Sequence, residues 1–95
     1  MELKPEVGKG TISLNKETSK NFKEHLIIYK NNKDKKNFYS VFALSSNGKV
    51  SGDMDGWGKK VSKKQIEALA IAECMTNNNK GKCFIYAIDD EIVWK

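Results

Sequence analysis

The chain has 95 residues, of which 39 % are hydrophobic and 9 % aromatic, so it has the size of one domain and is too apolar for a disordered tail. Its formal charge is +5, and every basic side chain is Lys. The lack of Arg disfavours a protein that reads phosphates and bases with the planar guanidinium. The Lys- and Asn-rich composition has three explanations: genomic base composition, a polyanion partner, or an anionic membrane surface.

The first ten residues leave the cellular compartment open. Residues 1–10 are polar and predict a flexible N-terminal segment, followed by a single domain over residues 11–95. The start of the chain lacks the charged-then-apolar pattern of a signal peptide, and no stretch approaches the ~20 apolar residues of a membrane helix. We therefore expect a chain that is cytoplasmic, or one that is periplasmic or secreted after removal of a signal peptide.

The first third of the chain predicts a short strand and a helix. Residues 11–14 alternate in polarity, which is typical of an edge strand. A helical pattern starts at Asn15, with Phe22, Leu26 and Tyr29 on one face. Residues 26–29 also have strand propensity, which is the alternative interpretation. The polar residues 31–36 predict a loop.

The middle of the chain predicts a hairpin. Residues 38–46 alternate with apolar side chains on both faces, which indicates a central strand. Asn47-Gly48 is a strong turn signal, because both residues tolerate positive φ. Residues 49–51 predict the partner strand, and the Gly- and Asp-rich residues 52–58 predict a loop that carries Trp57.

The last third predicts a helix and a second hairpin. Ser62 and Gln65 form a capping box, and Val61 can pack on Ile66 as a hydrophobic staple. Strands over residues 83–88 and 91–94 follow, joined by a turn at Asp89-Asp90. The predicted fold is α+β, with a mainly antiparallel sheet of four to five strands, two helices packed on one face, and the order β-α-β-β-α-β-β. The predicted apolar helix face comprises Ile66, Leu69, Ala70 and Cys74, widened by Ala68, Ala72 and Met75.

The two cysteines are the most informative residue pair. Cys74 lies near the end of the second predicted helix and Cys83 opens the next strand. The short turn between them allows the ~5.5 Å Cα separation of a disulfide. Two buried free thiols are the alternative. A catalytic thiolate is disfavoured because the dipole at a helix C-terminus opposes negative charge.

Other candidate chemistry is weak. The single His, His25, is expected to be a partly exposed helix residue rather than a catalytic base. Asp53, Asp55 and Gly56 resemble the start of a calcium loop, but Trp57 and Lys64 stand where an EF-hand needs oxygen ligands. We expect no metal, no cofactor and no enzymatic activity.

The segment over residues 58–64 is strongly basic and starts a helix, where backbone N–H groups favour anions. It resembles the turn into the last helix of double-stranded-RNA-binding domains, in which Lys63 and Lys64 would contact phosphates. This resemblance implies a cytoplasmic RNA-binding module that uses Lys59, Lys60, Lys63 and Lys64. A solvated, capped helix start is the alternative. The matching residues are Gly56, Gly58, Ser62, Lys63, Lys64 and Ala68.

A second resemblance covers residues 38–95. The motifs are Phe-Ala-Leu-Ser at residues 42–45, a helix that ends in Cys, Cys-Phe-Ile-Tyr-Ala-Ile at residues 83–88, and a closing Ile-Val-Trp. Together they resemble a group of small, uncharacterised, exported bacterial domains, many of which have a further Cys pair in the loop where this chain has none. The resemblance implies that Cys74 pairs with Cys83 and that the chain is exported.

These observations favour a non-enzymatic binding or structural module, exported and stapled by one disulfide. Its partner would be an unknown protein or envelope component, and a homodimer is possible. Four aromatic side chains are candidates for a contact surface, although core packing explains them equally well: Tyr39, Trp57, Tyr86 and Trp94. The cytoplasmic RNA-binding module is the alternative function.

Overall fold

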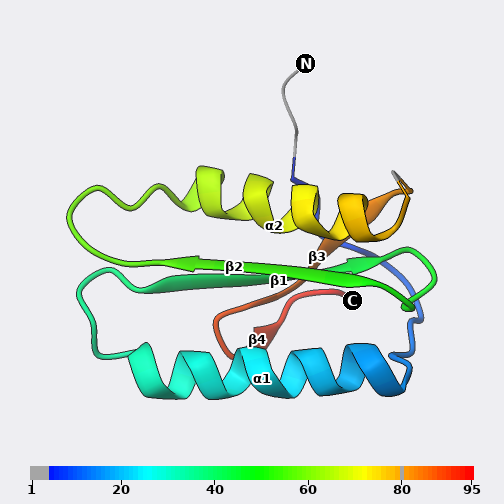
Figure 1. The fold of residues 1–95 in the computed structure, drawn as a ribbon, viewed down its shortest axis with the longest axis horizontal. Helices are drawn as coiled ribbons and strands as arrows, with labels where there is room; N and C mark the ends of the chain where they lie inside the picture. The colour runs from blue at the N-terminus through cyan, green and yellow to red at the C-terminus, as the bar shows by residue number, and fades with distance from the viewer. Residues whose placement is uncertain (1–4, 80) are drawn as a thin grey trace.

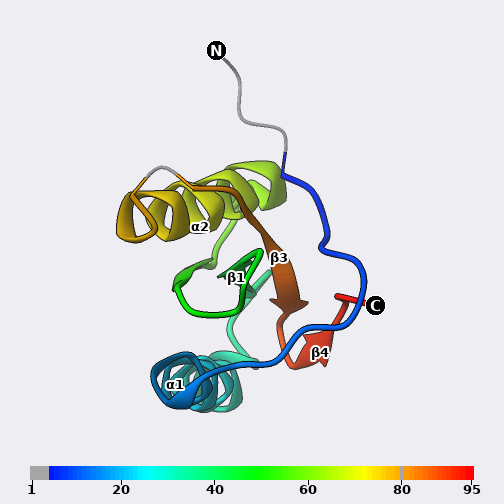
Figure 2. The same cartoon turned by 90° about the vertical axis from the view of Figure 1, so that its right-hand side faces the viewer.

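The computed structural model describes residues 5–79 and 81–95, and in that part of the chain two helices lie on opposite faces of a four-stranded sheet (Figures 1 and 2). The strands are all antiparallel and lie in the order β2-β1-β3-β4. The predicted α+β class and antiparallel sheet are therefore confirmed. In chain order the elements are α1 (Lys16–Asn32), β1 (Tyr39–Ser45), β2 (Ser51–Gly56), α2 (Lys63–Asn77), β3 (Cys83–Ile88) and β4 (Glu91–Ile92).

β1 is buried along its whole length and lies at the centre of the molecule. Its side chains alternate between the two faces of the sheet: Val41 and Ala43 pack under α2, whereas Phe42 and Leu44 pack under α1. The prediction that both helices cover one face is wrong. A strand that is apolar on both faces needs a cover on each, and one helix supplies each cover.

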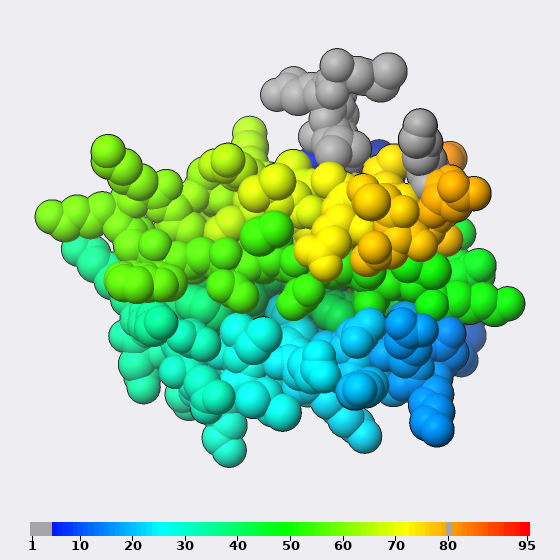
Figure 3. Space-filling view, in the orientation of Figure 1, coloured from blue at the N-terminus to red at the C-terminus, as the bar shows by residue number. Residues whose placement is uncertain are grey.

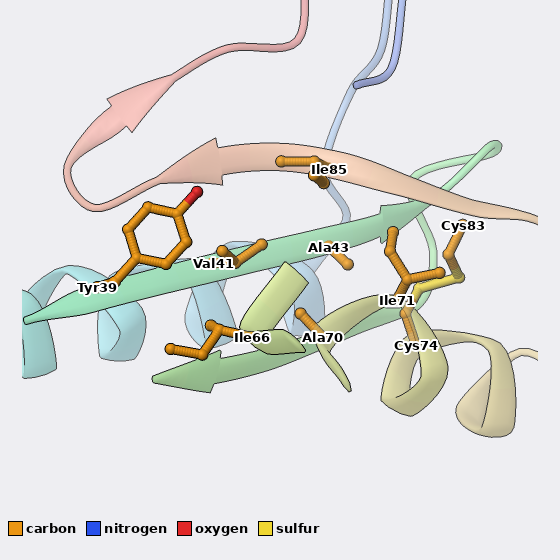
Figure 4. Close-up of a cluster of buried hydrophobic side chains, with 9 residues drawn as sticks. All are labelled: Tyr39, Val41, Ala43, Ile66, Ala70, Ile71, Cys74, Cys83 and Ile85. Carbon is orange, nitrogen blue, oxygen red and sulfur yellow. A yellow bond between two sulfur atoms is a disulfide. The ribbon is translucent and has the colours of Figure 1, made fainter. Parts of the chain in front are cut away.

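The α2 face of the sheet holds a continuous apolar cluster (Figure 4). Ser62 caps α2 as predicted, its hydroxyl accepting a hydrogen bond from the Gln65 N–H at 3.3 Å, but the Gln65 side chain does not return the bond that would complete the predicted capping box. Leu69, predicted to be buried, is 42 % exposed, and Ile71 is buried instead at 3 %. The cluster comprises Tyr39, Val41, Ala43, Ile66, Ala70, Ile71, Cys74, Cys83 and Ile85.

α1 starts at the predicted position, and its buried face is shifted from the predicted one but still includes Phe22, which packs against the core cluster of Phe42 and Tyr86. Asn15 is the N-cap and forms a capping box with Thr18. Thr18 and His25, seven residues apart, are the fully buried positions, whereas Phe22 is only partly buried. Thr18 can be buried because its hydroxyl donates to the Gly48 carbonyl at 2.9 Å.

The strand β2 replaces most of the loop predicted over residues 52–58. Its Asp and Gly residues have low β-propensity, and pairing with the apolar β1 supplies the order that the local sequence lacks. β2 is also an edge strand. α2 covers part of that edge, because the Asn77 side chain donates to the Ser51 carbonyl at 3.1 Å. Such covering protects an edge from pairing with another chain.

The N-terminal segment lies beside β3, away from the edge formed by β2, instead of remaining free. No strand forms at residues 11–14, and Val7 instead makes a parallel bridge with Ile85. Hydrogen bonds tie residues 6–10 to β3 and to the C-terminal residue, and the Trp94 indole donates to the Gly10 carbonyl at 3.0 Å. The flexible segment predicted over residues 1–10 is thus held in place from residue 6, and residues 1–4 lie outside the described part.

Gly52 sets the close approach of α2 to β2, and we expect Gly52→Ala to destabilise the fold. A Cβ there would lie 2.3 Å from the Cys74 backbone N and 2.8 Å from the Ala70 carbonyl. Because backbone has to shift, the free energy of unfolding should fall by about 2–3 kcal/mol. Urea unfolding measures this, with Asp55→Ala, an exposed position on the same strand, as the control. Equal stabilities of the two variants would contradict the tight packing.

Candidate functional site

The loops at one end of the molecule bring two lysine-rich segments together, and we call residues 33–36 and 57–64 the lysine end. The α1–β1 loop and the β2–α2 loop lie side by side at the left of Figure 1. The Gly58 N–H donates to the Lys36 carbonyl at 2.8 Å, and the Asn37 side-chain amide donates to the Gly58 carbonyl at 3.3 Å. The juxtaposition is therefore built by hydrogen bonds between the loops.

The lysine end carries the basic charge of the whole chain. It contains seven Lys and one Asp, a formal charge of +6, whereas the complete chain has +5. The rest of the molecule is therefore close to neutral. All seven lysines are exposed, and extended side chains project from this end in Figure 3. They comprise the four predicted anion-binding residues Lys59, Lys60, Lys63 and Lys64, joined by Lys33, Lys35 and Lys36.

Trp57 is the exposed aromatic side chain of this end. Of the four aromatic residues considered for a contact surface, Tyr39, Tyr86 and Trp94 are buried in the core, whereas Trp57 is 58 % exposed. The Lys35 ammonium lies 4.9 Å from the centre of the Trp57 ring. An exposed cation–π contact of this kind contributes about 0.5–1 kcal/mol, enough to orient the ring but not to bury it.

The start of α2 is fixed to the core beneath the lysine end. The Tyr39 hydroxyl donates to the Glu67 carboxylate at 2.5 Å, and the Lys63 ammonium lies 5.3 Å from the centre of the Tyr39 ring. Burial, together with the Glu67 hydrogen bond, raises the pKa of Tyr39, so its hydroxyl stays protonated and remains a donor. The lysines of the β2–α2 loop were predicted from the sequence, whereas those of the α1–β1 loop were not, because no local signal pairs the two loops.

The two cysteines form the predicted disulfide (Figure 4). It joins the end of α2 to the start of β3 with a Cα–Cα distance of 6.1 Å. Both residues are buried, Cys74 at 0 % and Cys83 at 7 % exposure. The sulfurs therefore belong to the apolar cluster on the α2 face, on the other side of the sheet from His25.

His25 is buried between α1 and the sheet, contrary to the expected partly exposed position. It is 2 % exposed and stacks on Phe22, with ring centroids 5.9 Å apart. Its Nε2 lies 2.7 Å from the Asp89 carbonyl oxygen, and because a carbonyl only accepts, Nε2 is the protonated nitrogen. This buried position was not predictable from the sequence, because the ring is held by a partner 64 residues away.

The carboxylates near His25 do not form a metal site. Within residues 5–79 and 81–95 no group of three His, Cys, Asp or Glu side chains is arranged to hold a metal ion. Asp89 is engaged by Ser40, whose backbone N–H and hydroxyl donate to Asp89 Oδ1 at 3.0 and 3.3 Å. Asp53 is half-buried on β2, and burial raises the pKa of its carboxyl.

A polar cavity of about 370 Å³ lies between the start of α1 and the end of α2. Its amide groups bond to the cavity wall, since Asn21 donates to the Ser51 hydroxyl at 3.0 Å and Asn77 donates to the Ser51 carbonyl. The charged side chains of Glu17 and Lys49 also line the cavity. Neither helix in the described residues is long and apolar enough to cross a membrane.

Comparison with known proteins gives no relative: no family model matches the chain, and no curated protein or solved structure is significantly similar to it. The lysine end therefore has to be interpreted from its own geometry.

Acidification should destabilise the protein through His25. Burial lowers the pKa of this side chain despite opposing contributions from the Asp89 carbonyl and nearby carboxylates. A folded-state pKa below the unfolded value of about 6.5 gives stability that is complete above pH 6.5 and is lost as pH falls toward the folded pKa. We expect urea midpoints to fall between about pH 7.5 and 5, and to fall less in His25→Gln, which cannot take up a proton.

The comparison of wild type with His25→Gln isolates this effect. The raised pKa values of Asp53 and Glu73 act in the opposite direction, because they make the fold relatively more stable as pH falls. Both groups remain in the variant, so the difference between the two proteins removes most of their contribution. An identical pH dependence in wild type and variant would show that His25 protonation is not coupled to unfolding.

Proposed function

We propose that this chain is a non-enzymatic binding module that acts after export in an oxidising compartment, with the lysine end as its surface for an anionic partner. The observation that carries the proposal is the Cys74–Cys83 disulfide, which is part of the core. Disulfides persist outside the reducing cytosol, and they are common in small domains whose cores are limited.

The position of the disulfide supports a structural role. It closes a sequence separation of 9 residues, and on the chain-entropy model this stabilises the folded state by about 2–3 kcal/mol. A domain of this size has a total stability of only about 5–15 kcal/mol. Reduction would therefore remove a substantial share of the stability, which favours a compartment where the bond is kept oxidised.

The arrangement of reactive side chains supports binding rather than catalysis. Both sulfurs are joined to each other and buried, so neither is available as a nucleophile. His25 lies on the other face of the sheet, and its Nε2 is already bonded to a carbonyl. The exposed, concentrated charge of the lysine end is instead suited to electrostatic binding.

The alternative function is the cytoplasmic double-stranded-RNA-binding module. The observation in its favour is that Lys59, Lys60, Lys63 and Lys64 are all exposed at the start of α2, next to Lys35 and Lys36. In this chain α2 is followed by β3 and β4, whereas it is the final helix of the domain that it resembles. The redox state of the cysteines separates the two functions.

We expect the disulfide to be stable at extracellular redox poise. Folded protein equilibrated with a glutathione buffer at that poise should yield no alkylated cysteine by intact mass. The Cys74→Ala/Cys83→Ala double variant should unfold with a free energy lower by about 2–3 kcal/mol in urea. Two alkylated thiols in the wild type would contradict the export proposal and would favour the RNA-binding alternative.

A further inference from the structure

The lysine end combines three features that no single segment of the chain has. It is strongly positive, it presents one large exposed aromatic side chain, Trp57, and both loops that form it are tied to each other. Trp prefers the boundary between water and apolar chains, where its ring is buried and its N–H stays wet. Lys stems bury along such a boundary while their ammonium groups remain in water.

We propose that the lysine end binds the surface of an anionic phospholipid bilayer, with Trp57 inserted at the headgroup level and the surrounding lysines on the lipid phosphates. This inference rests on the proposed function, because it names the anionic partner of the exported module. Each Lys near such a surface contributes an attraction equivalent to about a fivefold gain in affinity. A net charge of +6 in two adjoining loops is therefore sufficient for peripheral binding without a membrane-crossing helix.

The composition of the surface favours lipid over nucleic acid. The planar Arg fork, which suits bidentate contacts with guanine and phosphate, is absent from this chain. Sequence-tolerant binding of single strands uses several aromatic platforms, whereas among the described residues of the lysine end Trp57 is the exposed aromatic, with Lys35 above its ring. A single interfacial Trp surrounded by Lys suffices for a headgroup layer, which demands no register or sequence.

The test uses the oxidised full chain and vesicles of phosphatidylglycerol mixed with phosphatidylcholine. We expect binding by co-sedimentation at low salt, loss of binding at about 500 mM salt, and no binding to pure phosphatidylcholine. Trp emission should shift to shorter wavelength on binding. Trp57→Phe should show no shift, because its remaining Trp94 is buried at 8 % exposure in the core.

Matched charge reversals test the location of the surface. Lys59→Glu/Lys60→Glu, in the loop of the lysine end, should weaken vesicle binding by at least about tenfold. Lys16→Glu/Lys20→Glu changes the net charge equally but lies on exposed positions near the start of α1, at the opposite end of the molecule, and should weaken it much less (Figure 1). Circular dichroism and urea unfolding confirm that both variants remain folded.

Three results would overturn the inference. These are equal losses in the two double variants, equal binding to neutral vesicles, or tighter binding to double- or single-stranded RNA than to anionic vesicles at the same salt. A failure with vesicles is distinguishable from a failure of the proposed function, because the redox measurement on Cys74 and Cys83 is made without lipid. A stable disulfide with no vesicle binding leaves the exported module intact and rejects the lipid partner.

Discussion

The burial of β1 on both faces is the constraint on which the rest of the structure depends. All residues of Tyr39–Ser45 are buried, and the strand is paired on both sides by β2 and β3. No side of this strand is available to water, so its two apolar faces require two separate covers. The three-layer arrangement, with α1 and α2 on opposite faces, follows from that requirement.

The two covers differ in their chemistry. α2 meets an apolar face, approaches β2 closely at Gly52 and is joined to β3 by the Cys74–Cys83 disulfide. α1 meets a face that mixes aromatic rings with buried polar groups, and Thr18 and His25 hold it by hydrogen bonds to loop carbonyls. The α2 side is therefore covalently fixed, whereas the α1 side depends on a buried imidazole that acid can protonate.

The same topology assembles the lysine end. The start of β1 and the end of its antiparallel partner β2 lie at the same end of the sheet. The C-terminus of α1 and the N-terminus of α2 lead into and out of this end. Two loops that are separate in sequence therefore meet, and the Gly58–Lys36 hydrogen bond joins them. A modestly basic chain becomes a nearly neutral body with one strongly basic end, which is the feature that an anionic surface can recognise.

The sequence alone determined the features that depend on neighbouring residues. The turn at Asn47-Gly48, in which the Gly48 N–H donates to the Ser45 carbonyl, was predictable, and so were the Ser62 cap, the span of β3 and the cysteine pairing. Short-range backbone preferences and a short loop decide these features. Tertiary structure decided what depends on distant partners. β2 is ordered by β1, and His25 is buried by a carbonyl across the fold. The lysine end exists because two loops meet, and no local pattern encodes that meeting.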